Sequence, residues 1–281
     1  MPKVLKTIWD EFIYGGHLVA LGPTIIAYSY MRIENLNVAW FLLAGIYLIT
    51  YFIHLVDRYF DIKNDSSAAR SDHYKKYQGK IWFMLSGSFI LLVIAIIGSG
   101  TMMLAFSIFL ILIGLFYSLI FKKFTKYILG FKSFYTALAF ASVVFLCTFY
   151  FHEPVSINAV FIYLFFASRW FSNTTFCDLK DIKQDKTEGL KTFAVAFNTK
   201  KLYLFFYITA IISLLILTSG IYFGLLPFFM ITFVFPIIYN FYYLYLSRKP
   251  RANFQNLANV WADGESLIWL AAIVLGTNLW V

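Results

Sequence analysis

A succession of long apolar runs restricts the fold of this chain more than any other feature. Nine runs near the roughly 20 residues needed to cross a bilayer follow one another along the 281 residues. Only 13% of the residues are charged and 61% are hydrophobic, which excludes an ordinary soluble domain. The sequence therefore predicts an all-α, polytopic membrane protein with spans at residues 14–32, 37–56, 81–99, 102–121, 133–151, 157–177, 202–219, 222–246 and 262–280.

The basic residues predict the orientation of these spans. All but two of the 23 Lys and Arg residues lie before the first run or in alternate connections, the exceptions being Arg32 and Arg169. By the positive-inside rule, the N-terminus and these connections are cytoplasmic and the C-terminus lies on the opposite side. The net charge of +9 thus indicates topology and attraction to anionic membrane lipid, and we expect no nucleic-acid partner. Residues 1–13 are expected to form an interfacial amphipathic helix.

The second run ends in a row of like charges, Asp57, Asp61 and Asp65, which we call the first acidic motif. Carboxylates four residues apart on a helix repel one another by roughly 0.3 kcal/mol per pair. A neutralising partner is therefore expected at this row.

A second acidic motif, Asp178, Asp181 and Asp185, follows the sixth run. On one continuous helix these three residues fall within about 60° of arc. Both motifs precede long basic connections, which predicts two parallel four-helix repeats plus a ninth helix around a central apolar cavity capped on the cytoplasmic side. We expect one domain over residues 1–281, with the acidic-motif and cap loops at 57–80 and 178–201.

Facing carboxylates suit a hard divalent cation. Mg²⁺ (or Mn²⁺) prefers oxygen ligands and is commonly held by a few carboxylates together with substrate phosphates. The two motifs are therefore interpreted as a metal cage for a diphosphate at the cytoplasmic surface. The alternative interpretation is two solvated helix ends that nearby lysines balance.

Three stretches resemble the UbiA superfamily of intramembrane prenyltransferases. "IHLVDRYFD" is similar to the family's N-D-x-x-D-x-x-x-D, and "DLKDIKQDKTEGLKTFAV" to D-x-x-D-x-x-x-D followed by G-x-x-T-L-P-V. "YSLIFKK" resembles the family's Y-P-x-x-K-R. The chain departs from the pattern at Ile53 and His54, where the family has Asn-Asp, at Cys177 in place of Asn, and at Ala194 in place of Pro.

The resemblance implies Mg²⁺-dependent transfer of a prenyl group from an allylic prenyl diphosphate to a lipophilic acceptor, which is aromatic in part of the family. Pyrophosphate would be released through an allyl-cation-like intermediate. The implied metal ligands are Asp57, Asp61, Asp65, Asp178, Asp181 and Asp185. Of these, the resemblance implies direct catalytic roles for Asp57, Asp61, Asp181 and Asp185. The implied diphosphate-binding residues are Arg58, Tyr117, Lys122, Lys123 and Lys126.

Helical angles assign the remaining polar residues within the runs. His54 and Thr50 share the face of Asp57, so Thr50 is expected to line the cavity and His54 to accept a proton from the acceptor, or else to tie two helices together. Trp170, Phe171 and Thr174 lie nearer the face of the second acidic motif and are further cavity candidates.

Three other predictions concern pairing. Arg169 and Asn173 point about 150° away from the second acidic motif, so we expect them to pair across a helix interface. His17 is expected to make a structural hydrogen bond. Asp263 and Glu265 are expected to neutralise the nearby "SRKPR" connection.

Two other functions fit parts of the pattern. A membrane terpene cyclase of the same fold would let the allyl cation react within its own chain. A transporter or channel with an acidic cytoplasmic mouth would more often place ionisable groups near the bilayer midplane, beside broken helices. Because the carboxylates cluster at one surface, the transferase interpretation is preferred.

Overall fold

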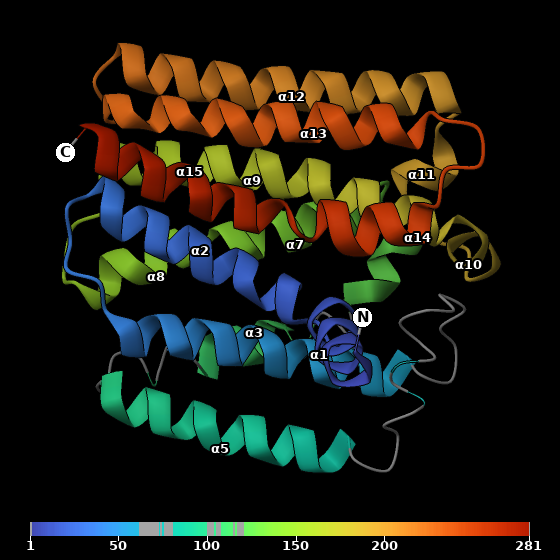
Figure 1. The fold of residues 1–281 in the computed structure, drawn as a ribbon, viewed down its shortest axis with the longest axis horizontal. Helices are drawn as coiled ribbons and strands as arrows, with labels where there is room; N and C mark the ends of the chain where they lie inside the picture. Colours follow the sequence, from blue (N-terminus) through green and yellow to red (C-terminus); the bar gives the residue numbers. More distant parts are fainter. Residues whose placement is uncertain are drawn as a thin grey trace. The chain divides into compact units, whose positions relative to one another are not determined.

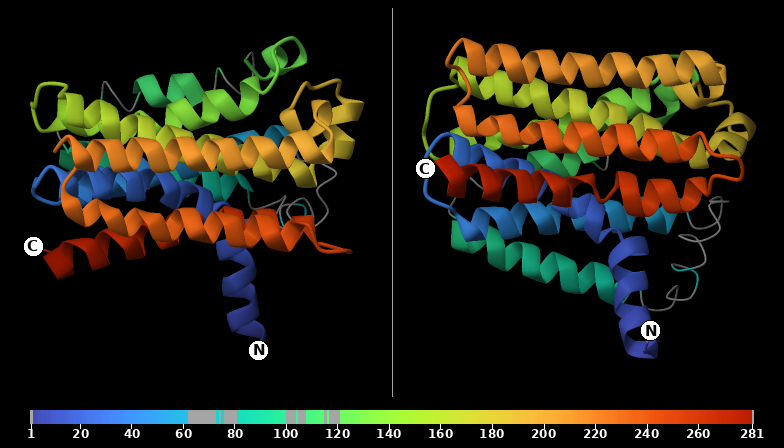
Figure 2. Two further views of the ribbon diagram at one scale, coloured as in Figure 1. Left: turned by 90° about the horizontal axis from the view of Figure 1, so that it is seen from above. Right: turned by 45° about the horizontal axis from the view of Figure 1, so that its top comes forward.

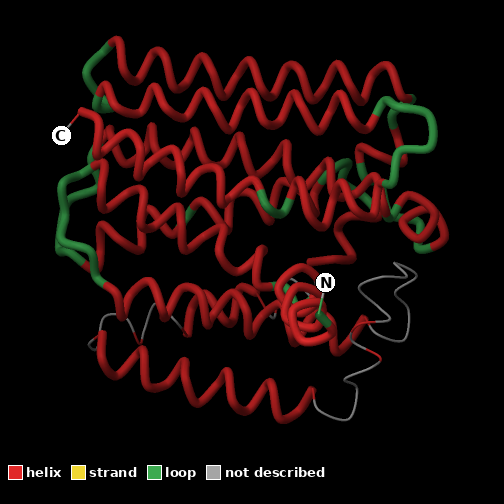
Figure 3. The backbone as a smooth tube through the Cα atoms, in the orientation of Figure 1, coloured by secondary structure: helices red, strands yellow, loops and turns green. Residues whose placement is uncertain are grey.

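The computed structural model describes residues 2–61, 73, 75, 81–99, 104, 108–114, 116 and 121–280. Within these ranges every regular element is a helix (Figure 1, Figure 3). The longer helices are α1 (Lys3–Tyr14), α2 (His17–Ile33), α3 (Trp40–Asp61), α5 (Ile81–Ser99), α7 (Phe131–Ala141), α8 (Val143–Tyr150), α9 (Ile157–Cys177), α12 (Thr199–Tyr222), α13 (Val234–Ser247) and α15 (Glu265–Trp280). The shorter ones are η2 (Phe121–Lys126), η3 (Asp178–Lys180), α10 (Ile182–Thr187), α11 (Phe193–Ala196), η4 (Phe228–Phe233), α14 (Phe254–Asn256) and η5 (Leu257–Ala262).

The chain forms two compact units. The first comprises Met1–Thr24 and Ala39–Phe124, and the second Ile25–Val38 and Thr125–Val281. The first acidic motif belongs to the first unit and the second acidic motif to the second unit.

The first unit is built around α3, which packs along α5. Ala20, Tyr51, Leu55 and Leu85 form a buried cluster there. A break at Gly15–Gly16 separates α1 from α2, whose axes differ by 61° (Figure 2). On α1 the side chains of Val4, Leu5, Ile8 and Trp9 are exposed, as a membrane-interface helix requires.

The second unit is centred on α9, which lies between α7 and α12. α13 packs against both α12 and α15 (Figure 1). Four aromatic side chains on α9, η4 and α15 are fully buried and pack in edge-to-face or tilted contacts: Phe165, Phe166, Phe233 and Trp269. Such contacts add stability beyond the burial of apolar area and tie the middle of α9 to η4 and α15.

Apolar side chains on the outside of the helices identify an integral membrane protein. In the described part of the chain five helices are long and apolar enough to cross a bilayer, or six if α1 and α2 are one broken span. The clearest is α12, with mean hydropathy 2.2 and only 33% of its span buried. Leu204, Ile208, Ile211 and Leu215 on this helix are exposed. Water would disfavour that surface and hydrocarbon solvates it.

Helices occur in most predicted spans. The predicted span 133–151 is confirmed as one apolar segment, Phe131–Tyr150, in which Ser142 separates α7 from α8. The predicted span 222–246 begins too early, since Gly224 adopts φ +68° and Pro227 precedes η4. Half of the predicted span 102–121 falls outside the described residues, so the count of nine stays a prediction.

Candidate metal and diphosphate site

The second acidic motif lies on a turn rather than on one straight helix. α9 ends at Cys177, η3 covers Asp178–Lys180, and α10 begins at Ile182. Asp181 lies between them with φ −105° and ψ 8°, and its amide donates to the carbonyl of Asp178 at 3.1 Å. The expectation of a single helix with a 60° arc was therefore wrong. The turn gives the carboxylates of Asp178 and Asp185 separate partners.

Asp178 is buried and both of its carboxylate oxygens are engaged. Ser133 donates its hydroxyl to Oδ2 at 2.8 Å, and the ammonium of Lys132 lies 3.0 Å from Oδ1. Only 2% of Asp178 is exposed, so an unpaired charge there would be costly. The first turn of α7 therefore provides both a hydrogen-bond donor and a counterion for the end of α9.

Asp185 is also buried, and it has a different partner. Thr192 donates its hydroxyl to Oδ2 of Asp185 at 3.1 Å. Burial raises the pKa of Asp185 to about 6, with the charges of Asp178 and Asp181 adding to the rise and that of Lys132 opposing it. The charges of Asp178, Asp181 and Lys132 are thus close enough to influence Asp185. A cation added beside these carboxylates would favour their ionised form.

The donor chemistry of this unit fits Mg²⁺ in part. Carboxylate oxygens are suitable ligands, and Mg²⁺ usually takes only one or two of them and fills its other positions with water and substrate phosphate. In the described part of the chain no three His, Cys, Asp or Glu side chains converge as a metal site. The second acidic motif alone therefore supplies an incomplete ligand set, and a metal would need oxygen ligands from elsewhere.

Backbone hydrogen bonds hold the partners of Asp178 beside the partner of Asp185. The amide of Gly130 donates to the carbonyl of Lys191, and the amide of Lys191 donates to Thr125, both at 2.8 Å. Gly130 adopts φ +67°, and a Cβ there would overlap the ring of Phe193. Glycine is required at position 130 for both reasons. These backbone hydrogen bonds join residues 125–130 to Lys191, and they fix the start of α7 relative to Thr192.

Of the first acidic motif, the structure places only one side chain. Asp57 is half-buried on α3. Asp61 ends this helix but its side chain lies outside the described residues, as does Asp65 altogether. Their predicted metal binding, and any approach of the two motifs to each other, stay predictions.

The predicted diphosphate ligands are placed in part. Lys123 and Lys126 are exposed on η2. Lys123 belongs to the first unit, which ends at Phe124, and Lys126 belongs to the second unit. The side chains of Arg58 and Lys122 and the whole of Tyr117 lie outside the described residues. Lys126 is therefore in the same unit as the second acidic motif. It follows Thr125, whose carbonyl accepts a hydrogen bond from the amide of Lys191.

The predicted cavity residues of the second unit are packed against other side chains. Trp170 is buried between the rings of Phe140 and Trp269. Phe171 is half-buried, and its ring contacts those of Phe134, Phe193 and Phe205.

The two threonines assigned to the cavity donate their hydroxyls to backbone carbonyls, and Thr174 also reaches the carbonyl of Ser133 on α7 at 3.3 Å. Thr174 donates to the carbonyl of Trp170 and Thr50 to that of Ile46, both at 2.9 Å. Their predicted contact with substrate stays a prediction. His54 packs its imidazole against Gly16, where a Cβ would overlap the ring, and its role as a proton acceptor likewise stays a prediction.

Arg169 pairs across a helix interface, as predicted. Its guanidinium binds the carboxylate of Glu265 at the start of α15, with Nε 3.1 Å from Oε1, and both side chains are fully buried. Tyr243 and Trp269 also donate to Glu265, at 2.8 and 3.2 Å. The expectation that Glu265 neutralises the "SRKPR" connection was therefore wrong. Asn173 donates to the carbonyl of Ala262 and secures the same interface.

A polar group in the first unit was only partly anticipated. His17 makes the expected structural hydrogen bond, through Nδ1 to the hydroxyl of Tyr47 at 2.5 Å, and its ring stacks on Tyr51. Glu11 lies 3.6 Å from His17 and 2.9 Å from Nε2 of His73. The contact between Glu11 and His73 spans 62 residues and has no spacing signal in the sequence.

Comparisons with known proteins agree with this fold. The model of the UbiA prenyltransferase family matches residues 18–262. A solved structure described as an apo UbiA homolog from Aeropyrum pernix K1 is 13% identical, with TM-score 0.69 over 91% of this chain and 96% of that one. A structure from a study of digeranylgeranylglyceryl phosphate synthase in membranes is 15% identical, with TM-score 0.56 over 97% and 98% of the two chains. No curated protein gives a significant sequence match.

Proposed function

This chain belongs to the UbiA prenyltransferase family, and we propose that it transfers a prenyl group from an allylic prenyl diphosphate to a lipophilic acceptor in the membrane, releasing pyrophosphate. The observation that carries the proposal is the cluster of Asp178, Asp181 and Asp185 at the end of a membrane helix, with a raised pKa at Asp185. Such a cluster suits a site whose charge is completed by a divalent cation and a diphosphate.

The proposed architecture has nine spans, formed by two parallel four-helix repeats and a ninth helix around an apolar cavity. In this arrangement the two acidic motifs face each other across the cavity at the cytoplasmic surface, and the N-terminus is cytoplasmic. The all-helical fold and the distribution of basic residues support the proposal. Residues 1–281 would form one such domain, with cap loops at 57–80 and 178–201.

Within the site the carboxylates would act as metal ligands, with Asp57, Asp61 and Asp65 on one side and Asp178, Asp181 and Asp185 on the other. Mg²⁺, when bound, supplies Lewis-acid stabilisation of the departing pyrophosphate. Thr192 holds the Asp185 carboxylate in place by its hydrogen bond, and Ser133 does the same for Asp178. The diphosphate oxygens would accept charge-assisted hydrogen bonds from Arg58, Lys122, Lys123 and Lys126.

The reaction is an ionisation followed by capture. The C–O bond of the prenyl diphosphate breaks with its electron pair on the pyrophosphate oxygen, and the allylic carbon becomes cationic. A nucleophilic atom of the acceptor forms the new bond to that carbon and loses a proton, for which His54 is the proposed acceptor. Apolar walls around the cation would exclude water, which would otherwise capture it.

Incubation of the purified protein with labelled prenyl diphosphates and Mg²⁺ tests the proposal. Pyrophosphate release that requires an added lipophilic acceptor, with formation of a prenylated product, supports transfer. Release without an acceptor, accompanied by a hydrocarbon product, would instead identify a terpene cyclase. No release with any donor by protein shown to be folded would contradict both activities and favour a transporter or channel.

A further inference from the structure

A row of polar contacts joins one face of α9 and η3 to the last part of the chain. The side chains that make these contacts follow one another at spacings of four, four and three residues, so they share one side of a helix: Arg169, Asn173, Cys177 and Lys180. Every one of them contacts the segment from Asn259 to Glu265. We call this row of contacts the α9 seam.

The α9 seam ends inside the second acidic motif. The ammonium of Lys180 donates to Oδ1 of Asn259 at 2.7 Å, and Lys180 lies between Asp178 and Asp181 in the chain. One turn earlier, Sγ of Cys177 lies 3.6 Å from a carboxylate oxygen of Asp263. The start of the second acidic motif is therefore held by the last part of the chain as well as by α7.

An irregular turn brings the partners in the last segment to α9. η5 is a π-helical turn, and the amide of Asp263 donates to the carbonyl of Ala258, five residues earlier, at 3.0 Å. On one continuous α-helix Asn259 and Glu265 would point about 120° apart and could not both face α9. The wide turn and the break before α15 let both side chains reach it. Such π-turns are rare and occur frequently at functional sites.

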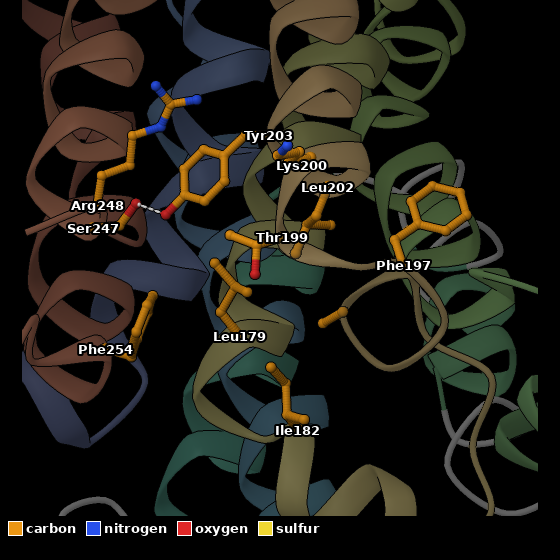
Figure 4. Close-up of a pocket in the computed structure, with 11 residues that line it drawn as sticks. Leu179, Ile182, Phe197, Thr199, Lys200, Leu202, Tyr203, Ser247, Arg248 and Phe254 are labelled. Carbon is orange, nitrogen blue, oxygen red and sulfur yellow. Dashed lines mark hydrogen bonds between the residues drawn. The ribbon is translucent and has the colours of Figure 1, made fainter.

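Apolar packing leaves part of this region unfilled. A pocket of about 510 Å³ lies beside the turn that carries Asp181, with Leu179 and Ile182 in one wall and Phe254 of α14 in another (Figure 4). Asn259 is fully buried and follows α14 directly. Because side-chain packing is incomplete here, the hydrogen bond from Lys180 to Asn259 is a principal restraint on this side of the turn.

We propose that Asn259 is a positioning residue for the second acidic motif. It holds Lys180, and through Lys180 it keeps the turn that carries Asp178 and Asp181 in the geometry that binds a divalent cation. Both polar ends of the Asn259 side chain are engaged within the protein, since its Nδ2 donates to Oε1 of Gln255 at 3.4 Å. This role rests on the proposed function, because it applies only if the carboxylates of the motif bind a metal.

Mn²⁺ binding, followed by electron paramagnetic resonance with an uncleavable prenyl thiodiphosphate present, tests this role without turnover. Asn259→Leu removes the acceptor for Lys180 and is expected to weaken Mn²⁺ binding roughly tenfold, the lower end of the range for a residue that supports a metal ligand. Asn259→Ser, which is too short to reach Lys180 but keeps a polar group in the turn, is expected to do the same. Asn259→Asp keeps an acceptor and should bind Mn²⁺ at least as tightly as the unaltered protein.

Tyr239→Phe is the matched control for damage to the π-helical turn. It removes the hydrogen bond from the Tyr239 hydroxyl to the carbonyl of Trp261, at 3.1 Å, and leaves the contact between Asn259 and Lys180 in place. This variant is expected to bind Mn²⁺ normally. Weakening as large as that of Asn259→Leu would show that any disturbance of the turn has this effect, and it would overturn the proposal.

A double variant separates positioning from a general loss of structure. In Lys180→Met the side chain of Asn259 no longer has an ammonium to hold, so adding Asn259→Leu should not change the Mn²⁺ affinity further. This comparison holds whatever effect the lost lysine charge has by itself. Equal weakening by Asn259→Leu in both backgrounds, or normal binding by Asn259→Leu alone, would overturn the proposal. Absence of Mn²⁺ binding by the unaltered protein would instead refute the proposed function, and this role with it.

Discussion

The ammonium group of Lys132 lies 3.0 Å from Oδ1 of Asp178, so the first carboxylate of the second acidic motif has a counterion from another helix. Ser133, the next residue, donates to the second oxygen of the same carboxylate. We interpret this pair as the contact that keeps α9 and α7 together when no divalent cation is bound. Lys132 and a metal ion would then both offset the same excess of negative charge.

Replacing Lys132 by methionine tests this interpretation. The variant leaves the buried Asp178 without its cation, and we expect the metal-free protein to lose about 1–3 kcal/mol of stability. Mg²⁺ is expected to raise the Tm of Lys132→Met more than that of the unaltered protein, because the metal replaces the missing charge. Lys132→Arg, which keeps the charge, serves as the control. Equal shifts of Tm with Mg²⁺ in all three proteins would show that Lys132 and the metal do not act on the same charge.

Thr192 is expected to position Asp185 rather than to contact the substrate. Thr192→Val removes the hydroxyl that donates to Asp185 and keeps the shape of the side chain. Residues that support a metal ligand contribute roughly 10–100-fold to metal affinity, and a weakening in that range is expected in a Mg²⁺ titration of pyrophosphate release. Thr192→Ser keeps the hydroxyl and should restore most of the affinity. If valine and serine behave alike, the hydrogen bond is not the reason for Thr192.

Arg169 is expected to act on stability alone. Arg169→Gln leaves the carboxylate of Glu265 buried without its cation, which typically costs about 3–5 kcal/mol. We expect poor expression and a lowered Tm in detergent. The double variant Arg169→Met with Glu265→Leu removes both charges and should recover part of that loss, since a buried ion pair often contributes little compared with apolar side chains. A stable Arg169→Gln protein that lacks only activity would contradict this assignment.

The affinity for Mg²⁺ is expected to depend on pH through Asp185. Burial raises the pKa of this carboxyl to about 6, and a metal ligand must be deprotonated to bind. Above pH 6 the carboxyl is already ionised and affinity should be nearly constant. Below it, binding must expel a proton, so the apparent affinity should fall by up to about tenfold per pH unit. Calorimetry of Mg²⁺ binding in buffers of different ionisation enthalpy would count the released proton, and a flat profile from pH 5 to 7 would exclude this linkage.

Some of these relationships are predictable from helical periodicity. Arg169 lies inside one long apolar run, and its angle relative to Asp178 correctly indicated pairing across a helix interface. Its partner was not predictable in the same way. Glu265 follows a basic connection in the chain, and this proximity favoured the connection as its partner. Arg169 and Glu265 are 96 residues apart, and helical periodicity gives no signal over that distance.

The partners of the second acidic motif illustrate a second limit of prediction from the sequence. Asp178, Asp181 and Asp185 are recognisable by spacing, but Lys132 and Ser133 belong to a different helix and have no spacing relationship to them. The turn at Asp181 was not predicted, because the spacing of residues along a helix does not show where an α-helix ends and a 3₁₀ segment begins. Thr192 did fall within a stretch that resembles the family pattern, and that resemblance was the signal that could have identified it.

The most direct test of the account measures whether both acidic motifs bind one metal and diphosphate together. Mn²⁺ binding can be followed by electron paramagnetic resonance in the presence of an uncleavable prenyl thiodiphosphate. Asp61→Asn and Asp181→Asn should each weaken Mn²⁺ binding roughly a hundredfold or more, since loss of a residue that only supports a ligand already costs up to about a hundredfold. Glu188→Gln, at the residue that follows α10, is the control and should bind Mn²⁺ normally. If only one of the two aspartate variants is impaired, or neither, the motifs do not share a metal and the central claim fails.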